Sequence, residues 1–248
     1  MMIVLPRDPD SILHAVMFAR LADAELWDDA DGLPLAAPVV LDAKDMRADA
    51  KRYKSAYGDF HKSWYDTRKR SVMHRHLFWA SRHHAHERVG IIAETVREAF
   101  SRGIDAVLQK SAVTHAHFLA YSNQAMREWH RLLGFIRLST PRPNMLYGEI
   151  QTDFHVVDAI LIFLRKRYPG NTIAVKNGTH MHFSGAPERI DTVDIKGTPE
   201  SEISRIFDVY YESQYIKERK NLRLLSHFVP KRYWEWISDG RKIARHAG

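Results

Sequence analysis

The chain has 248 residues, no cysteine and a formal net charge of +7. This length allows one large domain or two small ones with a packed core. The lack of cysteine excludes disulfides, thiolate catalysis and cysteine-bound zinc or iron–sulfur sites. The first residues turn polar at once, and the longest apolar run, Ala159–Leu164, is too short to cross a bilayer. We therefore expect a cytoplasmic protein without a membrane partner.

The charge is unevenly distributed along the chain. Residues 1–43 carry a net charge of −6, residues 44–88 carry +7, residues 89–214 are neutral overall, and residues 215–248 carry +6. Clustered Lys and Arg release counterions when they bind a phosphate backbone. The two basic regions therefore favour a nucleic acid partner, and the alternative is a solvated surface that is basic without such a role.

The N-terminal part of the chain is predicted to be mainly helical. Met2–Leu5 has the pattern of a short strand, and a helix with an apolar stripe follows it. Ala30–Val40 contains one glycine and two prolines and is predicted to be a loop, whereas Asp42–Tyr57 is predicted to be helical. Residues 60–100 continue as helices, and Gly103 is expected to end the last of them.

From residue 113 the pattern becomes a mixture of helices and strands. A helix over Val113–Leu133 is expected to end at Gly134. Runs rich in β-branched and aromatic residues then alternate with a helical stripe. The expected elements are the strands Phe135–Thr140 and Met145–Gln151, the helix Phe154–Tyr168, a hairpin of Thr172–Lys176 and His180–Ser184, and a long helix near Glu200–Tyr215.

These elements predict an α+β fold, built on a small antiparallel sheet with a strand–strand–helix–strand–strand core. We expect an N-terminal helical region and a C-terminal helix with a basic tail to cover this core. The expected division is residues 1–112, mainly helical with a short first strand, and residues 113–248, the α+β core with its basic aromatic tail. The two parts are expected to form one compact unit.

Histidines are concentrated between His74 and His86. His83 with Glu87, or His76 with both, could lie on one helix face within reach of a metal ion. The spacing matches no zinc signature, however, and the interleaved arginines oppose metal binding. A basic helix surface is therefore the favoured interpretation, and no metal site is assigned.

Two further pairs of polar residues each have two interpretations. Glu128 and His130 point in different directions from a helix, so they are either a charged surface or part of a site completed from elsewhere. Arg137 and Glu149 are expected to face each other across the first hairpin. They either line a cleft or form a cross-strand ion pair worth under about 1 kcal/mol.

His180 and His182 lie on the same face of their strand. They could bind phosphate or act as acid and base, and a solvated strand face is the alternative. A three-residue turn would place them beside Lys176, whereas a two-residue Asn-Gly turn would put histidine and Val175 on one face.

The C-terminal stretch Ile216–Trp236 combines cations with aromatic rings. Arg and Lys contact phosphates, and Tyr and Trp offer faces on which bases stack. The alternative is that the aromatic residues pin the tail to the domain. The predicted nucleic-acid-binding residues are Lys217, Arg219, Lys220, Asn221, Arg223, Lys231, Arg232, Tyr233 and Trp234.

The same stretch closely resembles the end of an uncharacterised bacterial and phage family, described as a probable DNA metabolism protein linked to a radical-SAM partner. The resemblance extends from about Val113 to Asp239. The segments that carry it are IKERKN at 216–221, PKRYW at 230–234, EWHRLLGFIR at 128–137, and Glu149 with His155.

The resemblance implies a role in DNA repair or base modification, since some members are fused to uracil-DNA glycosylase domains. We therefore expect a DNA-binding protein of such a pathway, or an enzyme that acts on a modified base, with DNA and a radical-SAM protein as partners. One alternative is an acyl or aminoacyl transferase acting on a nucleotide or a hypermodified thymine base. Another is a non-catalytic adaptor of a radical-SAM enzyme. No cofactor is assigned, and the candidate catalytic residues are Glu128, His130, Arg137, Glu149 and His155.

Overall fold

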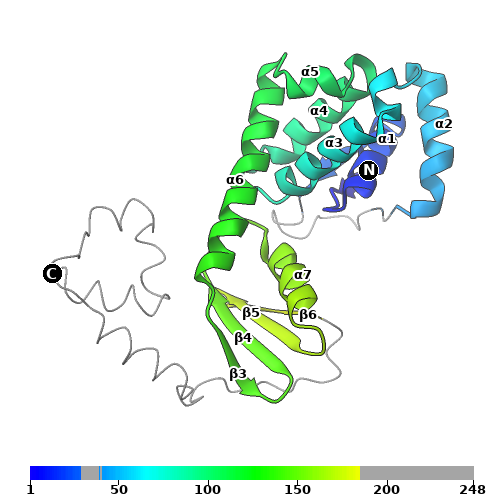
Figure 1. Ribbon diagram of the computed structural model, residues 1–248. Helices are drawn as coiled ribbons and strands as arrows, with labels where there is room; N and C mark the ends of the chain where they lie inside the picture. The colour runs from blue at the N-terminus through cyan, green and yellow to red at the C-terminus, as the bar shows by residue number, and fades with distance from the viewer. Residues whose placement is uncertain (29–38, 40, 185–248) are drawn as a thin grey trace, which may run out of the picture. The chain divides into compact units, whose positions relative to one another are not determined.

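The structure of the protein is a computed structural model that describes residues 1–28, 39 and 41–184 (Figure 1). In this part of the chain, helices predominate at first and a four-stranded sheet follows, which is the predicted α+β class. Within these residues, no helix combines the length and the apolar character needed to cross a membrane. The predicted helix near Glu200–Tyr215 and the basic tail lie outside the described residues, as does most of Ala30–Val40.

Contacts divide the chain into two compact units. Among the described residues, unit 1 comprises those of Met1–Glu128 with Phe154–Val156, and unit 2 comprises Trp129–Asp153 with those from Val157 onward. The division falls inside helix α6 (Val113–Phe135), whereas the sequence predicted a boundary before that helix.

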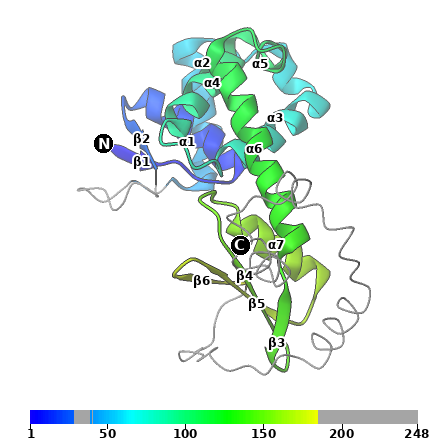
Figure 2. The ribbon, with the colours of Figure 1, turned by 90° about the vertical axis from the view of Figure 1, so that its left-hand side faces the viewer.

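Unit 1 begins with a strand, a helix and a second strand. β1 (Met2–Val4) pairs in parallel with β2 (Glu25–Trp27), and Figure 2 shows the two side by side. Between them, α1 (Pro9–Leu21) starts at Asp8, whose carboxylate accepts a 2.9 Å hydrogen bond from the Ser11 N–H. The sequence did not predict β2, because three residues carry too little of the alternating pattern.

The rest of unit 1 is helical and surrounds a core in which Ile12, Leu77, Ile92 and Phe118 are fully buried. Gly103 ends α4 (Arg88–Arg102) as predicted, with φ +95°. A Cβ there would lie 2.3 Å from Nδ1 of His61, so only glycine fits. The helices that precede α6 are η2 (Ala43–Asp45), α2 (Met46–Tyr57), η3 (Lys62–Tyr65), α3 (Thr67–Ala80), α4 (Arg88–Arg102) and α5 (Ile104–Leu108).

Buried polar pairs connect the elements of unit 1. Nε2 of His14 on α1 lies 2.9 Å from Oδ2 of Asp49 on α2, and Nη1 of Arg52 donates to the other oxygen of Asp49 at 3.1 Å. Arg88 of α4 forms a buried ion pair with Asp28, the residue after β2. Because each buried charge has a partner, these contacts can fix how the helices pack.

Unit 2 contains a four-stranded sheet whose strands are, in sheet order, β3 (Leu138–Arg142), β4 (Met145–Ile150), β5 (Thr172–Asn177) and β6 (His180–Ser184). β3 pairs antiparallel with β4, and β5 with β6, but β4 and β5 are parallel. The prediction of an antiparallel sheet was therefore wrong at the central pair, because helix α7 (Val157–Arg167) between these strands returns the chain to the end where β4 began.

Element boundaries in unit 2 differ from the predicted ones. Helix α6 continues through Gly134 to Phe135, so β3 starts only at Leu138. The predicted helix Phe154–Tyr168 starts at Val157, and residues 154–156 belong to unit 1. Neither change alters the order of the elements.

The hairpin of β5 and β6 has a two-residue turn. Asn177 pairs with His180, which leaves Gly178 and Thr179 as the turn, not Asn177 and Gly178. His182 lies opposite Val175, so histidine and valine share a face of the sheet. Neither predicted turn is present, but histidine and valine share a face, as expected for the two-residue turn, and the histidines do not lie on the face of Lys176.

Candidate functional site

A cluster of aromatic rings lies at the junction of α6 with the loop that follows α3. The His83 ring stacks 4.0 Å from Tyr121 and 4.5 Å from His84, between ring centroids. Phe154 lies edge-on to His83 at 5.1 Å and to His84 at 4.6 Å. His117 extends the stack beyond Tyr121 at 6.3 Å. We call these five residues the ring cluster.

Hydrogen bonds define the protonation of His83. The Ala85 N–H donates to Nδ1 at 3.1 Å, so the ring proton is on Nε2, which donates to Oε1 of Gln124 at 2.8 Å. Burial lowers the pKa of His83, which agrees with a neutral ring. Because both ring nitrogens have partners, His83 holds the loop against α6 and is not placed to transfer a proton.

Tyr121 and Glu87 form a donor–acceptor pair beside the stack. The Tyr121 hydroxyl donates to Oε1 of Glu87 at 2.7 Å. Burial, aided by this bond, raises the pKa of Tyr121 to about 12. The pKa of Glu87 is lowered, first by a hydrogen bond from its own backbone and then by Tyr121. With His84 exposed beside them, these groups can stack on a flat polar molecule and accept its hydrogen bonds.

Two of the five predicted catalytic residues lie in unit 1. Glu128 is 3% exposed and lies seven residues after Tyr121, on the same face of α6. The His155 backbone N–H donates to the Arg82 carbonyl at 2.9 Å. Both therefore come from elements that also build the ring cluster.

The other three predicted catalytic residues lie in unit 2. His130 and Arg137 are exposed. Glu149 accepts a hydrogen bond from the Tyr147 hydroxyl, and its carboxylate lies 3.6 Å from Nζ of Lys176. Burial, followed by the bond to Glu149, raises the pKa of Tyr147.

The predicted pairing of Arg137 with Glu149 is only partly visible in the backbone. Continuing the β3–β4 register by one residue beyond Leu138 and Gly148 places Arg137 opposite Glu149. The ion pair that the structure shows for Glu149 is with Lys176 on β5. Neither unit alone gathers all five predicted catalytic residues.

The histidines considered as metal ligands are engaged elsewhere. Nδ1 of His76 lies 2.9 Å from Oγ of Ser122, while His83 and Glu87 bond to α6 as described above. In residues 1–28, 39 and 41–184, no three His, Asp or Glu side chains are grouped so that they could hold a metal ion.

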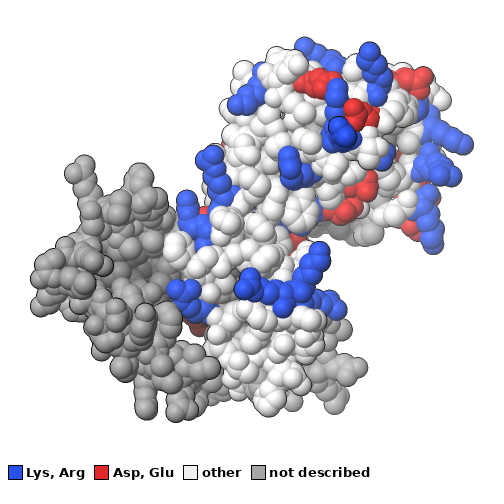
Figure 3. Space-filling view, in the orientation of Figure 1, with Lys and Arg blue, Asp and Glu red and all other residues white. Residues whose placement is uncertain are grey.

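A second surface of unit 1 combines exposed aromatic rings with cations. Tyr57 and Tyr65 are 44% and 66% exposed. The Arg20 guanidinium lies 4.0 Å from the Tyr57 ring centroid, and Nζ of Lys54 lies 3.0 Å from the Tyr65 hydroxyl. Figure 3 shows Lys and Arg side chains along the side of unit 1 where α2 runs. We call this the α1–α2 surface; it comprises Arg20, Arg47, Lys51, Arg52, Lys54, Tyr57 and Tyr65.

A known family matches most of the C-terminal part of the chain. Residues 86–239 match a family described as a domain of unknown function, DUF4130. The chain belongs to this family. Searches of curated proteins and of solved structures find no match.

The DUF4130 match covers only part of the candidate surfaces. It includes the five predicted catalytic residues, Tyr121 and the predicted tail. It begins after α2 and after His83, so the α1–α2 surface lies outside the DUF4130 range.

Sequence reasoning missed the α1–α2 surface as a set of residues. The +7 charge of residues 44–88 signalled it, but Arg20 reaches Tyr57 from a different helix, 37 residues away in sequence. The nine predicted tail residues of the DUF4130 range, Lys217 to Trp234, lie outside the described residues.

Proposed function

We propose that the protein binds nucleic acid within a pathway of DNA base repair or modification, with the α1–α2 surface as one contact region. The observation that carries the proposal is the alternation of exposed tyrosine rings with cations on this surface. Bases stack on aromatic faces and cations follow the phosphates, which is how proteins bind single strands with little sequence preference.

The packing of α2 supports this proposal. Its buried side places Asp49 and Tyr53 against the core, so Arg47, Lys51 and Arg52 are exposed. Such cations release counterions from a phosphate backbone, which makes the binding strongly dependent on salt.

The pathway part of the proposal rests on the resemblance described above. The family that the C-terminal stretch resembles implies DNA as a substrate and a radical-SAM protein as a partner. Tail residues such as Lys231 and Arg232 are proposed to add a second set of phosphate contacts.

Fluorescence anisotropy with a labelled single-stranded oligonucleotide tests the proposal. The variant Arg47→Gln/Lys51→Gln removes two cations of the α1–α2 surface. The matched control Arg102→Gln/Lys110→Gln removes two exposed cations elsewhere in unit 1. For the first variant we expect weaker binding and a shallower slope of log K against log salt, by about 1.4 if both cations contact phosphates of a single strand.

The control should keep the slope of the unmodified protein. Binding that does not weaken between about 50 and 200 mM salt would contradict the proposal, because phosphate contacts are lost over this range. An equal loss of affinity in the two variants would show that binding depends only on net charge. The α1–α2 surface would then not be a specific contact region.

The ring cluster favours a second candidate function, the binding of an unstacked base by an enzyme that modifies it. The exposed His84 ring offers a stacking face, and the Glu87 carboxylate offers an acceptor for a base amino group. Titration of a nucleoside, followed by NMR of the histidine ring protons, tests this candidate. The His84 signals should shift in the unmodified protein, and Glu87→Gln should weaken the binding.

A further inference from the structure

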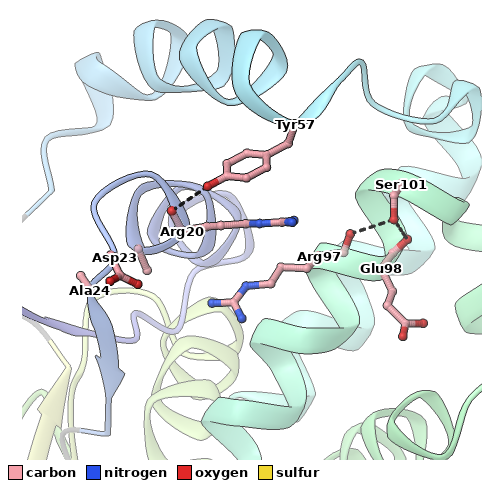
Figure 4. Close-up of a pocket in the computed structure, with 8 residues that line it drawn as sticks. Arg20, Asp23, Ala24, Tyr57, Arg97, Glu98 and Ser101 are labelled. Carbon is pink, nitrogen blue, oxygen red and sulfur yellow. Dashed lines mark hydrogen bonds between the residues drawn. The ribbon is translucent and has the colours of Figure 1, made fainter.

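A polar hollow lies between α1 and α4 of unit 1. Its volume is about 480 Å³, within the range of small-molecule sites. Figure 4 shows side chains from both helices and from the end of α2 around it. The polar side chains that line the hollow belong to Arg20, Asp23, Tyr57, Arg97, Glu98 and Ser101.

Arg97 is the central residue of this hollow. Nε of Arg97 is buried and has no hydrogen-bond partner in the part of the chain that the structure describes. A buried donor without an acceptor is unfavourable, and more so when the group is charged. Arg97 also lines a neighbouring hollow of about 530 Å³ beside β2. The Arg97 side chain thus lines both hollows, while no described residue satisfies its Nε.

Arg20 faces the same space from the opposite side. Its Nη1 donates to the Tyr53 hydroxyl at 2.9 Å, and its guanidinium lies over the Tyr57 ring. Figure 4 shows the Arg20 side chain extending from α1 toward α4, and the Arg97 side chain extending from α4 toward α1. The Arg20 guanidinium is held by these contacts, and together with Arg97 it places two cations around the hollow. Two guanidinium groups suit a phosphate, which accepts several charge-assisted hydrogen bonds.

The carboxylates around the hollow do not neutralise this pair of arginines. Glu98 lies 2.8 Å from Nε2 of His115 and 3.4 Å from Nη1 of Arg102, and Figure 4 shows its carboxylate turned away from Arg97. Asp23 remains at the α1 side of the hollow, where it can accept a hydrogen bond from a sugar hydroxyl or a base amino group.

We propose that this hollow binds the phosphate monoester of a nucleotide or of a 5′-phosphorylated DNA end. Arg97 and Arg20 contact the phosphate, and the Tyr57 ring lies beside the sugar or base. Because the hollow shares Arg20 and Tyr57 with the α1–α2 surface, the DNA-end form of the proposal rests on the proposed function. The nucleotide form does not.

Two binding measurements on the full chain distinguish these sources. The first is calorimetric titration with a deoxynucleoside 5′-monophosphate and with the same deoxynucleoside lacking phosphate. The second is the affinity for one oligonucleotide with a 5′-phosphate and with a 5′-hydroxyl. We expect the phosphate to strengthen binding about tenfold in at least one measurement, which is about 1.4 kcal/mol. The source is the ligand that shows the gain.

Variants of Arg97 then connect that gain to the hollow. Arg97→Gln should abolish the preference for phosphate, and Arg97→Lys should retain part of it because the charge remains. The control Lys110→Gln, which removes an exposed cation of unit 1 that does not line the hollow, should keep the full preference. Thermal unfolding followed by circular dichroism checks that each variant folds. If Arg97→Gln does not fold, the phosphate preference of Arg97→Lys tests the inference.

The result that overturns the inference is the lack of any preference for phosphate in both measurements, or a preference that Arg97→Gln leaves intact. A different outcome would overturn the proposed function alone. In that case both oligonucleotides fail to bind, while the monophosphate binds in a manner that depends on Arg97.

Discussion

The Arg20 guanidinium lies 4.0 Å from the centroid of the Tyr57 ring, and the Tyr57 hydroxyl donates a 3.0 Å hydrogen bond to the Arg20 carbonyl. The two residues thus fix each other where α1 ends and α2 ends. A tyrosine held in this way keeps a defined orientation while 44% of its surface stays exposed. An oriented ring of this kind loses little side-chain entropy when a base stacks on it.

Replacing Tyr65 by Ala should weaken the binding of single-stranded DNA by about 1–3 kcal/mol, because one stacking platform is lost. Tyr65→Phe keeps the ring and loses only the hydroxyl that Lys54 contacts. Its affinity should stay within a fewfold of the unmodified protein. Anisotropy titrations of both variants provide the measurement, and equal losses in Ala and Phe would argue against stacking.

Removing two tail cations with Lys231→Gln/Arg232→Gln should also reduce the salt dependence of DNA binding. If both residues contact phosphates of a single strand, the slope should fall by about 1.4. Combining this change with Arg47→Gln/Lys51→Gln should lower the slope by the sum of the two effects. A tail variant that binds with the original slope would show that these cations do not reach the phosphates.

The stability of the protein should fall as the pH is lowered, in part through His83. Burial lowers the pKa of His83 in the folded state, so between the folded and unfolded pKa values the unfolded state binds more protons. The contribution is therefore full above the unfolded value of about 6.5 and is lost as the pH falls through the folded value.

Denaturant titrations at pH values of about 7.5 and about 5 measure this effect. The loss of unfolding free energy on acidification should be smaller in His83→Gln than in the unmodified protein. His76, whose pKa is lowered first by burial and then by Arg75, adds a change of the same sign. An identical loss in the variant would show that His83 does not titrate with folding.

Replacing Asp49 by Ala should destabilise unit 1 by about 1–3 kcal/mol. The substitution leaves Nε2 of His14 buried without its acceptor, and the desolvation of that group is no longer offset. Asp45→Ala is the matched control, since this exposed carboxylate makes no capping hydrogen bond to α2, and it should stay within about 0.5 kcal/mol. Urea unfolding curves of the two variants provide the comparison.

Local features of the fold were predictable from sequence where a single residue or a short pattern decides the backbone. Gly103 ends α4 because a positive φ and the nearby His61 ring exclude any side chain, and a glycine after an apolar helical stripe is visible in the sequence. The hairpin around Gly178 was predictable because glycine readily adopts the positive φ that its turn requires. Helix α6, in contrast, passes through Gly134, because an isolated glycine costs a helix only about 1 kcal/mol.

The candidate site was harder to predict from the sequence than the fold. The sequence singled out Glu128 and His155, but it had no means of showing that His83, Tyr121 and Phe154 stack together, because they come from three separate segments. It also paired Glu149 with Arg137 across the hairpin. The parallel β4–β5 pair places Lys176 on the other side of Glu149 and within 3.6 Å of its carboxylate, and no periodic pattern in the sequence predicts that neighbour.

By itself, the sequence determined the α+β class, the order of the elements from residue 113 to 184, and the two basic regions. These follow from hydrophobic period, turn residues and charge counts, which are properties of short stretches of chain. Only the tertiary structure decided that Arg20 contacts Tyr57 and that His83 bonds to Gln124. It also decided that Arg97 lines the hollow between α1 and α4. Such contacts join residues distant in sequence, and they depend on how whole helices pack, which no local pattern encodes.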